Sequence, residues 1–437
     1  MLTARTSTRL TVALVVLSLV VLFAADPMRS TRVDAQSSTS IVSMHAGDTL
    51  QITCDGQTII VPKVEQLLVG CNPLPGEPSA TATATATRTA TAATSTPTVS
   101  PGTPSTTPTA IASPPPSVGS GLLRSRSELA SLSTSSSSWS ALKSAAYGSW
   151  GSPNLADLNS NHDVLTLAGA LAYARTGDVE LRGKVARALM SAIGTESGSR
   201  GLEVSRNVTS YVLAADLIDF AHYDSDREQT FRAWLAALRT KKMSDGRSIV
   251  STSEDRPNNW GTMAISARIA IDRYVDDKTD LSRAAAVFLG WLGNRSSYAG
   301  FSYGDLSWQS NRSAPVGINP KGASISGHDV DGVVPDDMRR GGSFTWPPFC
   351  EGYVHEGLQG AIVAAELLSR AGYDSWGASD KALLRAYTWL YAHGCAPSGD
   401  DRGFPHLINR AYGTSFAAAV PAPTGKNIGW LDWLTGK

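Results

Sequence analysis

The chain has 437 residues, and its 38 lysines and arginines balance its 38 aspartates and glutamates to a formal net charge of zero. Proteins that bind nucleic acid normally carry a basic excess, so this balance argues against that class. Hydrophobic residues make up 42% of the chain, which is enough for a large core. The four cysteines form no C-x-x-C pair, so a zinc module is not expected.

The N-terminus has the order of features found in a secretory signal. Arg5 and Arg9 precede an apolar run over 10–25, and the small residues at 33–35 offer a cleavage site. An uncleaved membrane anchor is the alternative, but the run is shorter than the ~20 residues of a spanning helix. We therefore expect a signal peptide over 1–35, no membrane span after its cleavage, and a secreted or surface-tethered protein.

Two further segments precede the main body. Residues 36–78 contain strand-like pieces at 50–53 and 58–61, and in an exported protein a disulfide between Cys54 and Cys71 would close this small unit. Residues 79–121 are almost entirely Ala, Thr, Ser and Pro, a composition that predicts a disordered linker. Such a linker acts as a spacer from a cell surface or as a passive, glycosylated connection.

After residue 122 the hydrophobic residues follow a helical period. The pattern predicts eight helices, over 164–177, 179–193, 202–220, from 225 onward, 257–274, 279–293, 356–371 and 380–393. Asp178 is expected to cap the second of them, Ser225 and Glu228 to form a capping box at the start of the fourth, and Thr279 to cap the sixth. Residues 294–352 are irregular and rich in Gly, Pro and Trp, and a coil-like tail ends the chain. The body is therefore predicted to be all-α.

Pairs of these helices are expected to form stacked hairpins, because Asn161, Asn207 and Asn259 recur at about the spacing of one helix pair. Stacked hairpins form either an open solenoid or a closed ring. A long irregular insertion is usually a lid or the wall of a site. We therefore predict an incomplete (α/α) toroid over 122–437.

Polar clusters recur where alternate helices start, and like ends of inner helices converge on one opening of a toroid. Because helix N-termini present free N–H groups, this opening suits an anion. Each cluster alone also fits ordinary helix capping. The candidate substrate-binding residues are Asn161, His162, Arg206, Asn207, Tyr211, Asn258, Trp260, Trp308 and Arg340, and the candidate catalytic residues are Asn259, Arg339, Tyr353 and His355.

These residue types fit β-elimination on a uronate polysaccharide, which needs no metal or other cofactor. Loss of the C5 proton builds negative charge onto the substrate carboxylate, and an Asn or Arg there stabilises that charge. A His or Tyr takes the C5 proton, and a Tyr donates a proton to the departing O4. The Trp260–Gly261 pair suits stacking on a sugar ring, and Arg339–Arg340 suit a carboxylate.

Over about 154–393 the chain resembles the alginate lyase family and its chondroitin-lyase relatives, which share an (α/α) toroid. The resemblance is concentrated in 258–261 and in 335–340 followed by Tyr353. It implies that Asn259 neutralises the carboxylate with Arg339 and that Tyr353 is the acid. The family commonly has a His after the Asn pair, where this chain has Trp260. The resemblance therefore leaves Tyr353, His355 or His328 as the base.

Two other functions remain open. An inverting glycoside hydrolase on the same toroid would use two carboxylates from the set Asp163, Asp255, Glu351, Glu356 and Asp400. A non-catalytic, carbohydrate-binding solenoid would lack a closed cleft. We expect the protein to be a monomer that binds an anionic polysaccharide and no nucleic acid. We also expect a disulfide between Cys350 and Cys395, beside the helix that follows Tyr353.

Overall fold

The structure is a computed structural model that describes residues 30–34, 40–43, 49–54, 57–62, 66–69 and 121–437. The chain divides into two units, one with the strands β1–β5 and one with the helices. Residues 1–29, Cys71 and almost all of the 79–121 segment lie outside the described residues. The signal peptide, the Cys54–Cys71 disulfide and the disordered linker therefore stay predictions.

The N-terminal unit contains two small sheets. In the larger one, β3 (Thr49–Cys54) pairs antiparallel with β4 (Gln57–Pro62) and parallel with β1 (Ser30–Asp34). In the smaller one, β2 (Ser40–Ser43) pairs antiparallel with β5 (Gln66–Val69). The strands predicted at 50–53 and 58–61 are confirmed within β3 and β4. β1 lies inside the segment predicted as a signal peptide, where no strand was expected.

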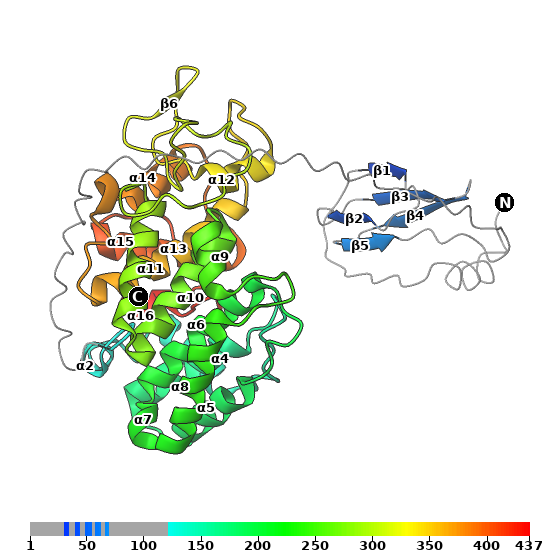
Figure 1. The fold of residues 1–437 in the computed structure, drawn as a ribbon. Coiled ribbons are helices and arrows are strands. Elements are labelled where there is room, and N and C mark those ends of the chain that lie inside the picture. The colour runs from blue at the N-terminus through cyan, green and yellow to red at the C-terminus, as the bar shows by residue number, and fades with distance from the viewer. Residues whose placement is uncertain (1–29, 35–39, 44–48, 55–56, 63–65, 70–120) are drawn as a thin grey trace, which may run out of the picture. The chain divides into compact units, whose positions relative to one another are not determined.

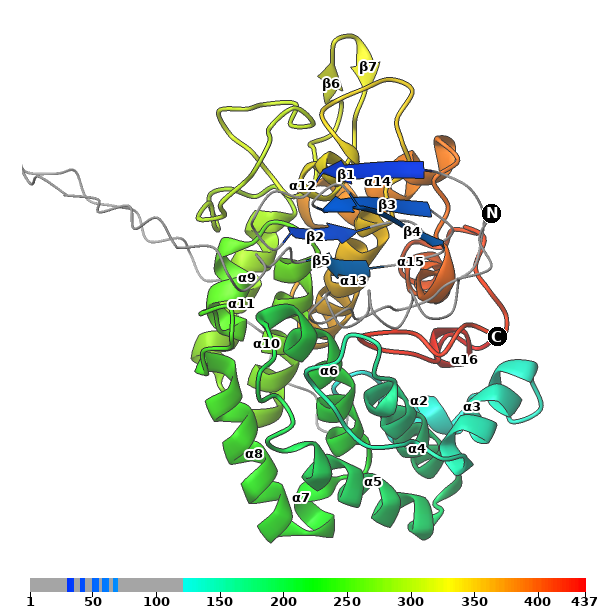
Figure 2. The same cartoon turned by 90° about the vertical axis from the view of Figure 1, so that its right-hand side faces the viewer.

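The second unit is helical, apart from the two-residue strands β6 (Ser324–Ile325) and β7 (His328–Asp329), so the predicted all-α class is confirmed for residues 121–437. Four of its helices are buried over most of their surface, and they pack in succession, α4 on α6, α6 on α10 and α10 on α13 (Figures 1 and 2). We call these four the inner helices. They are α4 (His162–Thr176), α6 (Gly201–Leu217), α10 (Asn259–Val275) and α13 (Tyr353–Arg370).

Each inner helix is followed along the chain by a helix that buries a narrower face. These are α5 (Val179–Ala192), α8 (Ser225–Thr240), α11 (Lys278–Trp291) and α14 (Ala378–Ala392). The alternation of broadly and narrowly buried helices is what a row of αα-hairpins requires. Two inner helices cross closely at Gly360 of α13, where an added Cβ would lie 2.3 Å from the Thr262 carbonyl carbon of α10.

The caps of these helices agree only partly with the prediction. Asp178 caps α5 as predicted, since its carboxylate accepts from the Glu180 N–H at 2.9 Å. The cap of α8 is Asp224, not Ser225, and the cap of α11 is Asp277, not Thr279. In both helices an aspartate just outside the predicted cap accepts a main-chain N–H, and a carboxylate is the stronger acceptor.

The sequence pattern missed several short helices, and the coil-like tail was partly wrong. The missed helices are α2 (Arg126–Ala130), α3 (Ser137–Tyr147), α7 (Phe220–Tyr223), α9 (Ile249–Asp255), α12 (Pro335–Met338), α15 (Pro405–Tyr412) and α16 (Leu431–Leu434), together with the 3-10 turns η1 (Arg339–Gly341) and η2 (Gly399–Gly403). Most span one or two turns, too short for a helical period to stand out. Apart from α12, η1 and the two-residue strands β6 and β7, residues 294–352 are irregular, as predicted.

The tail lies against three inner helices and is buried. Main-chain Asn427 accepts from the Ser210 hydroxyl of α6 at 2.7 Å, and its side chain donates to Ser266 of α10 at 3.3 Å. The Trp430 indole donates to the Val164 carbonyl of α4 at 3.0 Å. The C-terminal segment therefore joins α4, α6 and α10 in addition to their direct contacts.

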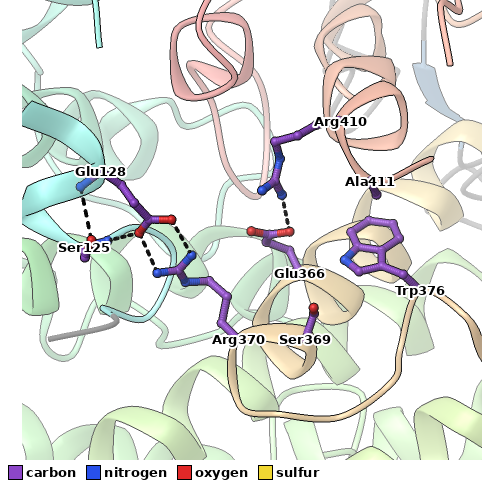
Figure 3. A pocket seen from close by; sticks show the side chains of 8 residues that line it. All are labelled: Ser125, Glu128, Glu366, Ser369, Arg370, Trp376, Arg410 and Ala411. Atoms are coloured by element: carbon purple, nitrogen blue, oxygen red, sulfur yellow. Dashed lines mark hydrogen bonds and ion pairs between the residues drawn. The ribbon is translucent and has the colours of Figure 1, made fainter. Parts of the chain in front are cut away.

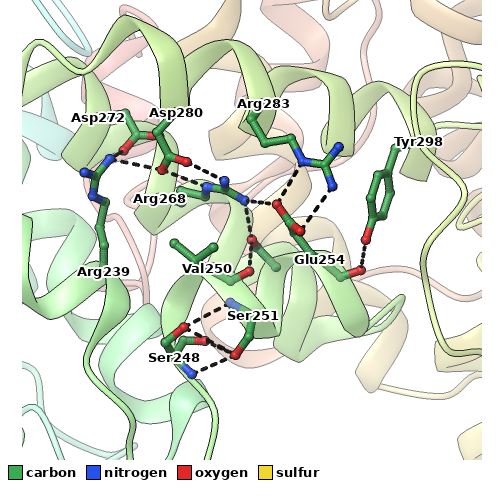
Figure 4. A network of polar contacts seen from close by, with 11 residues as sticks. Arg239, Ser248, Val250, Ser251, Glu254, Arg268, Asp272, Asp280, Arg283 and Tyr298 are labelled. Atoms are coloured by element: carbon green, nitrogen blue, oxygen red, sulfur yellow. Dashed lines mark hydrogen bonds and ion pairs between the residues drawn. The ribbon is translucent and has the colours of Figure 1, made fainter.

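Ion pairs tie the ends of several helices together. Figure 4 shows Arg268 between Asp280 and Glu254, with Arg239 and Arg283 on either side. At the C-terminal end of α13, Glu366 accepts from Arg410, and Arg370 pairs with Glu128 beside a cavity of about 540 Å³ (Figure 3). The arginines of these networks are held by carboxylates.

The disulfide between Cys350 and Cys395 is confirmed, with Cα atoms 5.1 Å apart. It joins the residues before α13 to those after α14, as expected. Within the described residues, no helix combines the length and the apolar character needed to cross a membrane.

Candidate functional site

Polar side chains gather near the N-terminal ends of the inner helices. They come from α4, α6, α10 and α13, from α12 and η1 in the long insertion, and from η2 and the tail. Arg206, Asn207 and Tyr211 lie inside α6 rather than at its start, because that helix already begins at Gly201.

The predicted Asn258–Asn259 pair opens α10 as expected. Asn258 is the N-cap, and its side-chain oxygen accepts from the Trp260 N–H at 3.2 Å. Asn259 is 1% exposed, and its amide donates to Glu356 of α13 at 2.9 Å, while its side-chain oxygen has no partner among the described residues. Half-buried Glu356, rather than Asn259, is therefore the more accessible member of this pair.

Asp337 of α12 lies behind this pair. Its Oδ1 accepts the Asn259 N–H at 3.1 Å, and its Oδ2 has no hydrogen-bond partner within the described residues. Burial raises the pKa of the Asp337 carboxyl well above its usual range. Gly357 of α13 permits this approach, because a Cβ there would lie 2.3 Å from Oδ2.

The two arginines of η1 have different surroundings. Arg339 is held by Asp336 through two hydrogen bonds of 2.6 and 3.1 Å. Arg340 is exposed, and its guanidinium carbon lies 4.0 Å from the centroid of the Tyr353 ring, which is 38% exposed. Of the predicted catalytic residues Arg339 is thus engaged within the protein, whereas Tyr353 faces solvent beside Arg340.

His355 is buried and has a defined tautomer. Its Nε2–H donates to the Cys395 carbonyl at 2.8 Å, so Nδ1 is the unprotonated nitrogen of the neutral ring. Nδ1 has no partner within the described residues, and burial lowers the pKa of the ring. The Cys350–Cys395 disulfide therefore lies next to the carbonyl that orients this imidazole.

The candidates on α4 and α6 build one side of the site. His162 Nδ1 lies 2.7 Å from the Tyr211 hydroxyl, and the exposed Asn161 accepts from Lys426 at 2.6 Å. Asn207 donates to three main-chain carbonyls of the 154–157 segment, the shortest of these bonds being 2.9 Å to Asp157. Asn207 thus supports the segment that leads into α4.

The aromatic candidates Trp260 and Trp308 differ in exposure. Trp260 is half-buried, and the guanidinium carbons of Arg200 and Arg256 lie 5.4 and 5.6 Å from its ring. Trp308 is 2% exposed, and its indole donates to the Gly342 carbonyl at 3.0 Å, so it supports the insertion. His328, one of the possible bases, stacks on Trp346 in the same insertion.

Arg206 is unusual among the arginines of residues 121–437. It is half-buried, yet its guanidinium makes neither an ion pair nor a hydrogen bond within those residues, and its Nε is fully enclosed. The Arg206 charge acts on the pKa values of Asp163, Asp401 and Lys426, and in each case its own contribution lowers the pKa, so all three groups lie within electrostatic range of Arg206. Burial nevertheless raises the pKa of both carboxyls to about 7. Arg206 is therefore only partly neutralised at neutral pH.

Four residues of this site were not proposed as binding or catalytic residues from the sequence. They are Asp337, Gln359, Asp401 and Lys426. Gln359 donates to Asp401 of η2, and the Glu356 charge contributes to the raised pKa of Asp401. Asp401 and Lys426 belong to a region that reads as coil, so no periodic signal places them near α6. Gln359 lies inside a predicted helix and Asp337 in a predicted acidic turn, and nothing in the sequence distinguishes either residue from its neighbours as part of a site.

No family model, curated protein or solved structure matches this chain.

Proposed function

We propose that residues 122–437 form an incomplete (α/α) toroid that cleaves a uronate-containing polysaccharide by β-elimination. Two observations support the ring. The four inner helices pack in one row with their polar N-terminal ends on the same side, and the tail returns from α15 to contact α4.

The observation that carries the activity is the unpaired, half-buried guanidinium of Arg206. A charge in that position is costly unless it meets an anion, and burial keeps its neighbouring carboxyls partly protonated at neutral pH. A substrate carboxylate supplies the missing anion and forms a bidentate pair with the guanidinium. When C5 loses its proton, the same contact stabilises the charge that develops on the carboxylate.

Tyr353 provides the proton-transfer group in this proposal. It faces solvent at the start of α13, and the Arg340 guanidinium carbon lies 4.0 Å from the centroid of its ring. The Tyr353 phenolate takes the C5 proton and, as the phenol it has become, returns that proton to the departing O4, so one side chain is sufficient for a syn elimination. Asn259 positions Glu356 and α13, while buried His355 maintains the packing at Cys395.

A second activity is favoured by one specific observation, the Glu356–Asp401 pair. Burial raises the pKa of Asp401 to about 7, the range that a general acid needs, and the Glu356 charge adds to this rise. An inverting glycoside hydrolase requires such an acid together with a carboxylate base. Substituting Asp401→Asn tests this alternative, because hydrolysis would then be lost.

A panel of uronate polymers distinguishes the two activities. β-Elimination creates a C4–C5 double bond that absorbs in the ultraviolet, whereas hydrolysis adds reducing ends without that absorbance. Tyr353→Phe keeps the ring under Arg340 and removes only the transferable proton, so it should abolish the absorbance while substrate binding is retained. Unchanged kcat in Tyr353→Phe would exclude this mechanism.

A further inference from the structure

The most exposed aromatic ring of residues 121–437 lies four residues before Tyr353. Phe349 is 61% exposed, more than any other Phe, Tyr or Trp side chain in that part of the chain, and it stacks on no other aromatic ring there. An added Cβ at Gly341 of η1 would lie 3.2 Å from its Cδ1, so one edge of the ring lies against that turn. Phe349 therefore presents to solvent an aromatic face that the proposed proton transfer does not use.

The segment that carries Phe349 is held in place on both sides of the ring. Three residues before it, Trp346 stacks on His328 with the ring centroids 4.5 Å apart. Directly after it, Cys350 is joined to Cys395 by the disulfide. Both anchors tie the segment to residues that are distant in the sequence or in another element. The exposure of Phe349 is therefore a feature of a fixed segment rather than of a free loop.

Phe349 and Tyr353 border the same turn. Gly341 of η1 lies against the Phe349 ring, and the preceding residue, Arg340, has its guanidinium carbon 4.0 Å from the centroid of the Tyr353 ring. Because the Cα atoms of consecutive residues are about 3.8 Å apart, the two rings flank one short stretch of main chain. A polymer that reaches Tyr353 therefore has the Phe349 ring beside it.

The surroundings of the Phe349 ring are open, and their charges are mixed. A Cβ added at Gly342 or at Gly352 would meet nothing within 4 Å. Arg340 is exposed and makes no ion pair or hydrogen bond within the described residues. Half-buried Glu351 has a carboxylate oxygen 3.4 Å from the Cβ position of Gly341. Since one charge of each sign borders the ring, its aromatic face is the feature that this surface offers to a ligand.

A sugar unit fits this surface better than a protein partner does. The C–H bonds on one face of a pyranose ring carry partial positive charge, and the face of an aromatic ring is negative. A stable protein interface buries about 800 Å² on each partner and contains several apolar side chains. Here the single ring of Phe349 adjoins the exposed glycines 341, 342 and 352. A flat ligand can therefore approach the ring, whereas an apolar interface has little else to bury.

We infer that Phe349 stacks on a sugar unit of the polysaccharide beyond the unit on which Tyr353 acts, so that affinity rises with chain length. The inference rests on the proposed function for the class of ligand and for the place of the reacting unit. Phe349 supplies an uncharged contact in addition to the charged contact of Arg206. Its share of the affinity should therefore be the same at low and at high ionic strength.

Calorimetric binding of oligosaccharides measures this contact without turnover. The protein carries Tyr353→Phe to prevent cleavage, and the probes are the hexasaccharide and the disaccharide of mannuronate and of alternating glucuronate and N-acetylglucosamine. We expect an added Phe349→Ala change to weaken the binding of a hexasaccharide about tenfold, the range of one aromatic stacking contact, and to leave the disaccharide of the same polymer unaffected. An unchanged hexasaccharide affinity, or no binding of either hexasaccharide, would overturn the inference.

Three matched variants separate stacking from other effects. Phe349→Tyr keeps the aromatic face and should bind the hexasaccharide as tightly as the parent protein. Phe349→Leu keeps an apolar side chain without that face and should lose nearly as much affinity as Phe349→Ala, so full affinity in Phe349→Leu would contradict stacking. Tyr147→Ala removes a ring that is 51% exposed on α3 and should leave binding unchanged. A loss in Tyr147→Ala equal to that in Phe349→Ala would contradict the assignment.

The stacking contact and the proposed activity can fail separately. If Phe349→Ala loses hexasaccharide affinity but no polymer gains a double bond, the stacking contact stands and the lyase proposal fails. If a polymer gains the double bond but Phe349→Ala cleaves the hexasaccharide with unchanged kcat/KM, the lyase proposal stands and the stacking contact fails. A wild-type dimer that Phe349→Ala converts to a monomer in sedimentation would show that a second copy covers the ring, and would also overturn the inference.

Discussion

At the scale of single residues, Arg206 differs from the arginines of Figures 3 and 4, because those are paired with carboxylates and Arg206 has no ionic partner within residues 121–437. We expect Arg206→Ala to reduce kcat on a uronate polymer by about 10²–10³-fold, because one donor to the developing charge is lost. The melting temperature should change little, since no ion pair is broken.

The control for this change is Arg187→Ala. Arg187 is exposed on α5, and its guanidinium also forms no ion pair or hydrogen bond within the described residues, so its removal changes the net charge equally. A loss of activity in Arg187→Ala equal to that in Arg206→Ala would point to a general charge effect.

Asp163 makes the stability of the helical unit dependent on pH. Burial raises the pKa of this carboxyl from 3.8 in the unfolded chain to about 7, so the folded state retains a proton that the unfolded state loses. The associated stability is full below pH 3.8 and is lost as the pH rises to 7, by up to about 4 kcal/mol. Asp163→Asn should therefore raise the melting temperature at pH 8 more than at pH 4.

The exposed Asp157→Asn is the matched control for this measurement. We expect its melting temperature to follow wild type at both pH values. An Asp163→Asn effect of the same size at pH 4 and pH 8 would show that the carboxyl does not retain its proton on folding.

At the scale of helices, the contact between α10 and α13 sets the geometry of the site. An alanine Cβ at Gly360 would lie 2.3–2.5 Å from the main chain of Thr262 and Met263, which cannot move as a side chain does. Gly360→Ala should lower the free energy of unfolding by about 1–3 kcal/mol through overpacking, as measured by denaturant titration.

Gly183→Ala on α5 is the control for that substitution. Its Cβ would meet only the ends of Arg187 and Tyr223 at 3.4 Å, and alanine is the better helix former by about 0.5–1 kcal/mol. This variant should be as stable as wild type or more so. Stability losses of equal size at both glycines would argue against a specific crossing at Gly360.

The Cys350–Cys395 disulfide connects the two ends of the last hairpin across 45 residues. Closing a loop of that length removes unfolded-state entropy worth about 4 kcal/mol in the chain-entropy model. The double substitution Cys350→Ser and Cys395→Ser should therefore lower the melting temperature, and adding reductant to wild type should lower it similarly. Insensitivity to reductant would mean that the bond adds little stability.

Helices with a long apolar period could be predicted from the sequence, and so could the cap of α5 at Asp178. The site was predicted only in part. Asn259 and Glu356 share one hydrogen bond at adjacent helix starts, but Asp401 and Lys426 arrive through segments without a period. The sequence pattern also does not show which polar side chains are already engaged or which aromatic side chains are buried. Arg339 is bound by Asp336, and Trp308 is buried.

At the scale of the whole molecule, the residues just before α2 are bonded to the helices of the second unit. The Leu122 N–H donates to Asp216 at 2.8 Å, and buried Arg124 pairs with Glu366 at 2.6 Å. A chain that begins at Gly121 should therefore melt cooperatively. In a chain that begins at Arg126 the free energy of unfolding should fall by several kcal/mol, because buried Glu366 loses its partner Arg124. Equal melting temperatures for the two chains would contradict this boundary.

The most direct test of the account is the formation of a C4–C5 double bond, followed by ultraviolet absorbance, on uronate polymers and on the same polymers with their carboxyl groups reduced to alcohols. Wild type should generate the absorbance only on the carboxylate form, and Arg206→Ala should lose it by about 10²–10³-fold. Reducing ends that appear without absorbance, or equal cleavage of the carboxyl-reduced polymer, would contradict recognition of a uronate by Arg206.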